Sequence, residues 1–434
     1  MEGSSAAAPD GAPPSFREAA GIWAKIGLLS FGGPAAQIAL MHRILVEEKR
    51  WMAEPLYLSA LSFCMLLPGP EAMQLATYAA WRLHGTKGGI TAGLLFVLPG
   101  AFVVLALSAI YVAFGNLPLV AALFLGIKSA VLVIVIEALL RIGRRALKGR
   151  QHWTIAALAF IGIFFLAMPF PLIVLLAAAW GFVRAARNPA ASAAIERPRL
   201  GGQTLRTAAL WLAIWLVPLG ALAYAFGFDH VVTQLAAFFS RLSVVTFGGA
   251  YAVLAYMSQD VVVQHHWLEA GQMMDGLGLA ETTPGPLILV TEFVGFVAAW
   301  RNAGGGSWIM ALLGAAVALW ATFAPCFLWI FTGAPYVEWL TRQARLKGAL
   351  DAITAAVVGV ILNLAVWFAL HVFFAKVDAV RDGPLILWTP EPASLDWRVV
   401  VLAALSAALL LYRHWNMVAV LAVAAAGGLV LSLA

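Results

Sequence analysis

Long apolar runs separated by short polar or basic loops occupy most of the chain. Five uninterrupted runs are each long enough for the ~20 residues that cross a bilayer. They lie at 88–114, 118–140, 207–226, 307–331 and 348–374. Two more runs, 153–183 and 397–434, contain central turns and predict hairpins of short helices. The pattern predicts an all-α polytopic membrane protein.

The remaining apolar segments carry glycine and proline at their centres. Pro68-Gly69-Pro70 and Pro284-Gly285-Pro286 each interrupt such a segment, and proline in a helix interior costs roughly 3 kcal/mol. Lipid cannot satisfy the freed carbonyl groups, so each break is expected to face protein and line a cavity. The helix that restarts after a break offers free N–H groups and the positive end of its dipole, which suits an anion.

Equivalent features recur in one order along the two halves of the chain. Phe31-Gly32-Gly33 matches Phe247-Gly248-Gly249, and the two Pro-Gly-Pro breaks match each other at the same separation along the chain. Pro99 matches Pro325 at a slightly larger separation. We therefore predict a membrane repeat at 15–187 and another at 231–434. Residues 188–230 are predicted to form a basic linker and one unpaired span, and residues 1–14 a disordered N-terminus.

Charge predicts the orientation of these repeats. The chain is 63% hydrophobic and 11% charged with a formal net charge of +6, and its basic residues gather in short loops typical of the cytoplasmic side. That placement argues against nucleic-acid binding. It predicts two inverted repeats of about six helices, joined by one span, with the N-terminus cytoplasmic and the C-terminus outside. The Phe-Gly-Gly and Pro-Gly-Pro segments either cross fully or are re-entrant, which changes the count by pairs.

Several stretches resemble the chromate ion transporter (CHR) family in its long two-domain form. They are Ser30-Phe31-Gly32-Gly33-Pro34-Ala35-Ala36-Gln37, Pro68-Gly69-Pro70-Glu71-Ala72-Met73-Gln74, Thr246-Phe247-Gly248-Gly249-Ala250-Tyr251 and Glu281-Thr282-Thr283-Pro284-Gly285-Pro286. The resemblance implies a secondary transporter that exports chromate across the inner membrane and gives resistance, with sulfate as a related oxyanion.

A tetrahedral dianion can be held by helix N-termini, hydroxyl groups, amides and a cation. The substrate-binding candidates are Gly32, Gly33, Gln37, Pro68, Gly69, Pro70, Glu71, Gln74, Lys128, Gly248, Gly249, Thr282, Thr283, Pro284, Gly285 and Pro286. The glycines equally suit close helix packing. A structural kink is the alternative role of each Pro-Gly-Pro, and its recurrence at equivalent places favours binding. Lys128 either faces the site or extends to the membrane interface.

Two acids are candidates for coupling transport to a proton. Glu71 follows the first Pro-Gly-Pro, where a carboxylate repels an anion unless it is protonated, and Glu281 precedes the second. A helix N-terminal charge that satisfies the backbone is the alternative role of Glu71. A counter-anion is the alternative coupling ion.

Other functions find little support in the sequence. Cys64 and Cys326 lie in separate apolar runs, and no metal-binding, cofactor-binding or nucleotide-binding motif is found. No enzyme activity and no cofactor are therefore predicted. A passive anion channel remains the alternative, with a membrane-embedded enzyme behind it. The sequence leaves dimerisation open.

Overall fold

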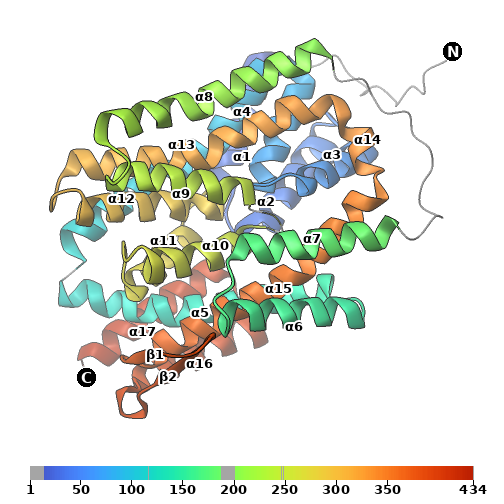
Figure 1. The fold of residues 1–434 in the computed structure, drawn as a ribbon. Helices are drawn as coiled ribbons and strands as arrows, with labels where there is room; N and C mark the ends of the chain where they lie inside the picture. The colour runs from blue at the N-terminus through green and yellow to red at the C-terminus, as the bar shows by residue number, and fades with distance from the viewer. Residues whose placement is uncertain (1–13, 116, 187–200, 246, 248, 434) are drawn as a thin grey trace.

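The computed structural model describes residues 14–115, 117–186, 201–245, 247 and 249–433, which are almost entirely helical (Figure 1). The predicted disordered segment 1–14 lies outside the described residues apart from Pro14, as does the first part of the basic linker, 188–200. Five described helices are long and apolar enough to cross a membrane by length and composition.

The first half contains two broken helix pairs followed by long helices and a short hairpin. Its helices are α1 (Phe16–Leu29), α2 (Gly33–His42) with a π-helical extension (Arg43–Glu48), α3 (Glu54–Leu66), α4 (Glu71–Phe114), α5 (Pro118–Ala146), α6 (Arg150–Phe164) and α7 (Phe170–Ala186). Helix α4 is kinked at His84 and Gly85, and Gly85 has a φ of 62°.

The second half repeats this order after α8 (Gly202–Phe226), which corresponds to the predicted unpaired span. Its elements are α9 (Val231–Val245), α10 (Ala250–Gln259) with a π-helical extension (Asp260–Gln264), α11 (Ala270–Thr282), the 3₁₀ turn η4 (Leu287–Leu289), α12 (Val290–Asn302), α13 (Trp308–Gly333), α14 (Val337–Thr341), α15 (Ala344–Phe373), β1 (Val377–Asp382), β2 (Leu385–Pro390), α16 (Trp397–Ala407) with a π-helical extension (Ala408–Tyr412), and α17 (Met417–Leu433). Both predicted hairpin turns, near 168–171 and 412–416, separate helices as expected.

The broken helix pairs fold back on themselves as hairpins, which favours the re-entrant alternative over full crossings. Lys49, just past the α2 extension, places Nζ 3.1 Å from Oε1 of Glu18 near the start of α1. At the end of α12, Arg301 places Nη2 3.1 Å from Oε1 of Glu269, the residue before α11. Each pair therefore ends beside its own beginning, with the break at its tip.

The other two pairs also fold back at their breaks. The rings of Phe63 in α3 and Tyr78 in α4 lie 5.9 Å apart, on either side of the first Pro-Gly-Pro. The rings of Phe238 in α9 and Tyr256 in α10 lie 6.1 Å apart. Hydropathy had not distinguished such hairpins from full crossings, because both contain the same number of apolar residues.

Basic side chains gather at one end of the molecule, which we call the basic end. The Arg345 guanidinium lies 5.6 Å from the centre of the Phe182 ring, so the end of α7 meets the start of α15. The hydroxyl groups of Thr204, at the start of α8, and Tyr336, which precedes α14, are hydrogen-bonded at 2.8 Å. In Figure 1, α14 and the end of α7 lie towards the right.

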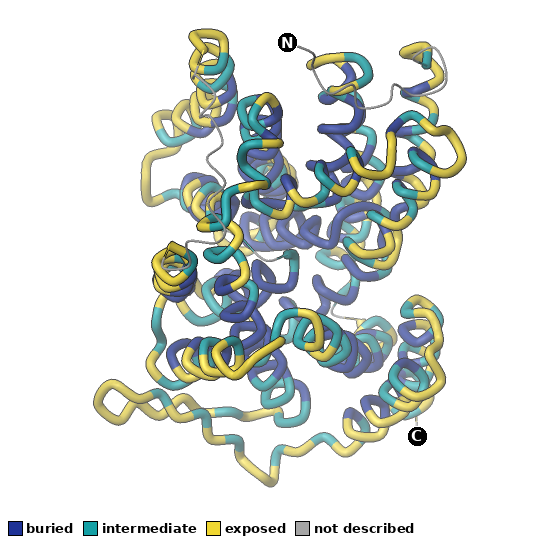
Figure 2. Tube along the Cα trace, turned by 90° about the vertical axis from the view of Figure 1, so that its right-hand side faces the viewer, coloured by how far each residue is buried: buried dark blue, intermediate teal, exposed yellow. Residues whose placement is uncertain are grey.

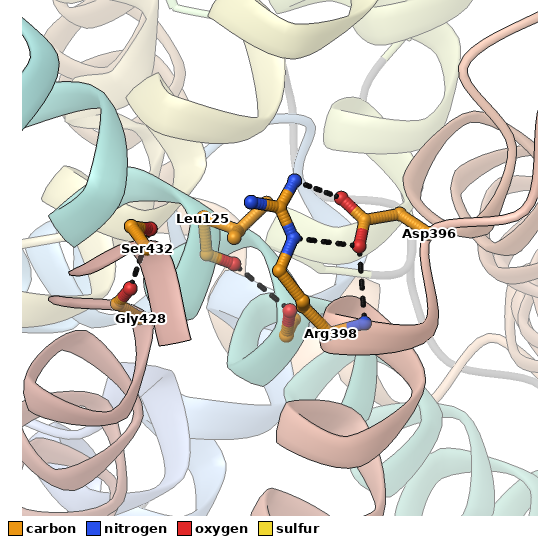
Figure 3. Close-up of polar contacts among 6 residues, drawn as sticks. Leu125, Asp396, Arg398, Gly428 and Ser432 are labelled. Atoms are coloured by element: carbon orange, nitrogen blue, oxygen red, sulfur yellow. Dashed lines mark hydrogen bonds and ion pairs between the residues drawn. The ribbon is translucent and has the colours of Figure 1, made fainter. Parts of the chain in front are cut away.

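The β1–β2 hairpin marks the opposite end, which we call the outer end. The Ile386 N–H donates to the Phe165 carbonyl at the α6–α7 turn, at 2.7 Å. The two strands are antiparallel, with Val377 opposite Pro390 and Asp382 opposite Leu385. Asp396 then caps α16, accepting a bond from the Arg398 backbone N–H at 3.0 Å and two from its guanidinium (Figure 3).

The long helices pack across the two halves through small residues. Helix α7 lies along α15, and α17 lies along α5. A Cβ atom added to Gly181 would lie 2.1 Å from the Gly348 carbonyl oxygen, and one added to Gly126 would lie 1.8 Å from that of Ala424. Glycine therefore lets these backbones approach closely, as in membrane helix packing generally.

The buried residues form a central core, and the periphery is exposed (Figure 2). Many exposed side chains are large and apolar, such as Leu210 and Val217 of α8 and Phe102 of α4. A soluble protein rarely exposes so much apolar surface, whereas the bilayer interior favours it.

Candidate functional site

The tips of all four re-entrant hairpins meet at one small pocket in the core. Its lining is Pro34, Gln37, Gly69, Pro70, Glu71, Ala72, Gly249, Ala250, Pro286, Leu287 and Ile288. Both Pro-Gly-Pro breaks and both glycine-containing breaks thus contribute to one site. The pocket volume is about 20 Å³, which is room for water and not for a larger ligand.

Four helical segments begin at this pocket. They are α2, α4, α10 and η4, which leads into α12. Among the described residues, no side chain caps the first turn of any of them. Free N–H groups and positive dipole ends from both halves therefore surround the pocket, an arrangement that favours an anion.

The second Pro-Gly-Pro is held by the first half. Gln37 Nε2 donates to the Gly285 carbonyl at 2.6 Å and to that of Ser30 at 3.3 Å. The Gly285 N–H donates to the Ser30 carbonyl at 2.8 Å. Both backbone groups of Gly285 are thus bonded to the α1–α2 hairpin. Gln37 is 1% exposed, and its Oε1 has no hydrogen-bond partner within the described part of the chain.

The first Pro-Gly-Pro is held by its own hairpin. Gln74 Nε2 donates to the Pro68 carbonyl at 2.7 Å, and both residues belong to the α3–α4 pair. Gly69 has a φ of +114°, and a Cβ atom there would lie 3.0 Å from Sγ of Cys326. Glycine is required at this tip because the backbone enters the left-handed region beside another side chain.

The two coupling candidates differ in their distance from the pocket. Glu71 lines it and, among the described residues, has no ion-pair partner. Glu281 lies outside the lining and accepts a hydrogen bond from the Tyr251 hydroxyl at 2.9 Å. Tyr251 directly follows Ala250, which lines the pocket, so Glu281 is connected to the start of α10 through the Tyr251 hydroxyl.

Several predicted residues support the breaks without lining the pocket. The Thr282 and Thr283 hydroxyls donate to the carbonyls of Leu279 and Ala280 in the last turn of α11. Lys128 pairs with Asp275 at 3.3 Å. Gly32, Gly33, Pro68, Gln74, Pro284 and Gly285 are likewise absent from the lining, and Gly248 lies outside the described residues.

Sequence reasoning missed five of the lining residues. Pro34, Ala72, Ala250, Leu287 and Ile288 were not among the candidates. Their side chains carry no recognisable chemistry, because what they bring to the pocket is the first turn of a helix. Their positions directly after the breaks were the only available signal.

Comparison with protein families decides what this arrangement belongs to. A family model described as "Chromate transporter" matches residues 18–182 and again residues 233–429. The chain belongs to the chromate transporter family. It is thus a multi-pass membrane protein of a transporter family and not an enzyme. The two matched segments coincide closely with the two halves described above.

Relatives cover nearly the whole chain. A chromate transport protein of Pseudomonas aeruginosa is 34% identical over 90% of this chain and 91% of its own length. A chromate transport protein of Cupriavidus metallidurans is 30% identical over 82% of this chain and 83% of its own. The uncharacterized transporter YwrB of Bacillus subtilis matches 38% of this chain but 86% of its own length, which corresponds to about one of the two halves. No solved structure matches the chain.

Proposed function

We propose that the protein exports chromate across the cytoplasmic membrane, with sulfate as a competing oxyanion. The observation that carries this proposal is the meeting of four uncapped helix N-termini at one buried pocket. A doubly negative guest gains from each of these dipole ends. The relatives named for chromate transport support the choice of oxyanion.

The two halves act as inverted repeats that expose the pocket to each side in turn. Support comes from helix direction, because α5 ends with Arg144 and Arg145 whereas its equivalent α15 begins beside Arg345. Transporters of this plan hold substrate at the repeat interface between broken helices. The pocket of about 20 Å³ is too small for an oxyanion, so binding requires the tips to separate.

Transport is coupled to an ion, for which we propose a proton carried by Glu71. In the pocket, an ionised carboxylate repels a dianion, whereas a protonated one donates a hydrogen bond to it. Glu71→Gln should therefore transport chromate with a weakened dependence on the pH gradient. Normal transport with unchanged pH dependence would exclude this role for Glu71.

Uptake of radiolabelled chromate and sulfate into inverted vesicles, with and without a pH gradient, tests the proposal. We expect uphill chromate accumulation that sulfate reduces. Replacement of both Pro70 and Pro286 by alanine should abolish it, and Pro171→Ala, in the distant α6–α7 hairpin, should not. Flux that stays strictly downhill under every gradient would instead indicate a passive anion channel.

A further inference from the structure

A buried polar cluster joins the two halves outside the anion pocket. Lys128 Nζ in α5 lies 3.3 Å from Asp275 Oδ1 in α11, and the side chains are 27% and 6% exposed. The Tyr111 hydroxyl in α4 donates to Asp275 Oδ2 at 2.8 Å. Lys128 and Tyr111 belong to the first half and Asp275 to the second. The cluster therefore ties the hairpin that carries the second Pro-Gly-Pro to the first half.

This cluster lies between the pocket and the outer end. Helix α11 starts beside Arg301 at the end of α12, and it finishes at the second break. The chain continues from α12 into α13, which runs to α14 at the basic end. The start of α11 is thus at the outer end, and Asp275 stands partway along α11 towards the tip.

Close packing surrounds the cluster. A Cβ atom on Gly278 would lie 2.2 Å from Cγ2 of Ile127, so α11 reaches α5 at a distance that only glycine permits. The Tyr111 ring lies 5.2 Å from that of Phe293 and 5.3 Å from that of Phe124. These contacts leave the charged pair with aromatic and aliphatic neighbours.

The equivalent place in the other half has no such cluster. When the two Pro-Gly-Pro breaks are aligned, Asp275 corresponds to Ser59 in α3. When Pro99 is aligned with Pro325, Lys128 corresponds to Thr354 in α15. The Thr354 hydroxyl donates within its own helix, to the Leu350 carbonyl at 2.8 Å. Helix α3 also packs against α15 much less than α11 packs against α5. Among the described residues, the equivalent positions of the other half therefore hold no ion pair between α3 and α15.

We propose that Lys128, Asp275 and Tyr111 form an outer gate, which holds the pocket closed to the outer end and must separate before the anion leaves. The proposal rests on the alternating-access function proposed above. The three side chains are positioning residues, because they act by holding or releasing the α11–α12 hairpin and do not touch the anion. Breaking the gate shifts the population towards the outward-open state.

Side-specific labelling of a pocket cysteine tests the gate without a transport assay. Ile288→Cys lines the pocket, and Cys64→Ala with Cys326→Ala removes the native thiols. A membrane-impermeant maleimide is added to right-side-out and to inverted vesicles. The parent should react faster in inverted vesicles, where the reagent meets the basic end.

Loss of the gate should speed labelling from the outer side. Asp275→Asn should raise the rate in right-side-out vesicles by roughly tenfold, because it leaves the partly buried Lys128 without its counter-charge. Tyr111→Phe, which removes one hydroxyl and preserves packing, should raise it less. The exchange Lys128→Asp with Asp275→Lys should return the rate towards the parent value, because it restores the ion pair.

Matched controls come from the equivalent positions, since Ser59→Ala and Thr354→Ala should leave the outer-side rate unchanged. The gate is refuted if Asp275→Asn and Tyr111→Phe both label at the parent rate. It is equally refuted if the equivalent positions give the same increase. Equal labelling of the parent from both sides would instead overturn the proposed alternating access.

Discussion

The two Pro-Gly-Pro breaks share one sequence but are held in different ways. Both backbone groups of Gly285 bond to the α1–α2 hairpin of the other half. The Pro68 carbonyl of the first break instead bonds to Gln74 of its own α3–α4 hairpin. One tip is thus tied across the repeat interface, and the other is stabilised within its own half.

This difference follows from single substitutions between the repeats. When the two Pro-Gly-Pro breaks are aligned, Gln37, which holds the second break, corresponds to Val253, and Glu71 corresponds to Leu287. Duplication supplied two similar scaffolds, and divergence at a few positions placed an amide and an acid on one side only.

The largest expected effect contrasts Gly100 with Cys326, which are equivalent because they directly follow the matched prolines Pro99 and Pro325. A Cβ atom on Gly100 would lie 2.1 Å from the Pro284 carbonyl oxygen, so Gly100→Ala pushes against the second break. We expect a loss of about 3 kcal/mol in stability and little remaining chromate transport.

Cys326→Ala is the matched change at the first break and removes only a sulfur atom. We expect it to cost about 1 kcal/mol and to retain transport. Thermal unfolding in detergent and vesicle transport measure both variants. Equal loss of transport in the two variants would mean that the helices carrying Gly100 and Cys326 do not pack differently against the two breaks.

The second prediction concerns a variant in which each half contributes an acid to the pocket. Leu287→Glu places a second carboxylate opposite Glu71, and like charges in a buried site cost several kcal/mol. We expect the concentration of chromate for half-maximal transport to rise by roughly tenfold or more. Leu287→Gln has the same size without the charge and should change it less. Similar values for the two variants would argue against an anion in this pocket.

The third prediction separates the two glutamines. Gln37→Leu and Gln74→Leu each leave a buried backbone carbonyl without its donor, which costs about 1–3 kcal/mol. Gln37 lines the pocket and holds the second break, whereas Gln74 lies outside the lining and holds the first. Both variants should lower the melting temperature, but only Gln37→Leu should weaken chromate binding. Equally weakened binding would contradict the asymmetry.

The smallest effect concerns the second half outside the membrane-spanning segments. Hydrogen bonds from Arg398 hold the pKa of Asp396 below its usual value of 3.8. The carboxylate therefore stabilises the folded state above about pH 4, and this contribution is lost as the pH falls through its lowered pKa.

Asp396→Asn should accordingly cost up to about 1 kcal/mol at neutral pH, because asparagine still caps the helix but loses the charge that pairs with the Arg398 guanidinium. The difference from the parent should shrink as the pH falls below about 4. Thermal unfolding at several pH values measures it, with the exposed Asp382→Asn as control. A difference that does not change with pH would contradict the role of the carboxylate.

Much of the fold followed from local signals in the sequence. Proline and glycine located the breaks, and their equal spacing revealed the repeat. The direction of the chain after each break could not be predicted, because a re-entrant pair and a crossing helix bury the same apolar residues. The β1–β2 hairpin was missed although Asp382-Gly383, a favourable hairpin turn, lies where its strands join.

The site was predictable where its chemistry is carried by the breaks themselves. Gly69, Pro70, Glu71 and Pro286 were candidates and line the pocket. Lys128 was considered for the anion, yet it pairs with Asp275, which is far away in sequence. Only the packing of α5 against α11 brings the two together, and no local pattern encodes that contact.

The central claim is that one anion is held jointly by helix N-termini of both halves. The most direct measurement is an experimental structure of the protein with chromate, locating the metal by its anomalous scattering. We predict one chromium site within hydrogen-bonding reach of the backbone N–H groups of Ala72 and Ile288. Chromium found only at the basic loops, or beside one Pro-Gly-Pro alone, would contradict the account.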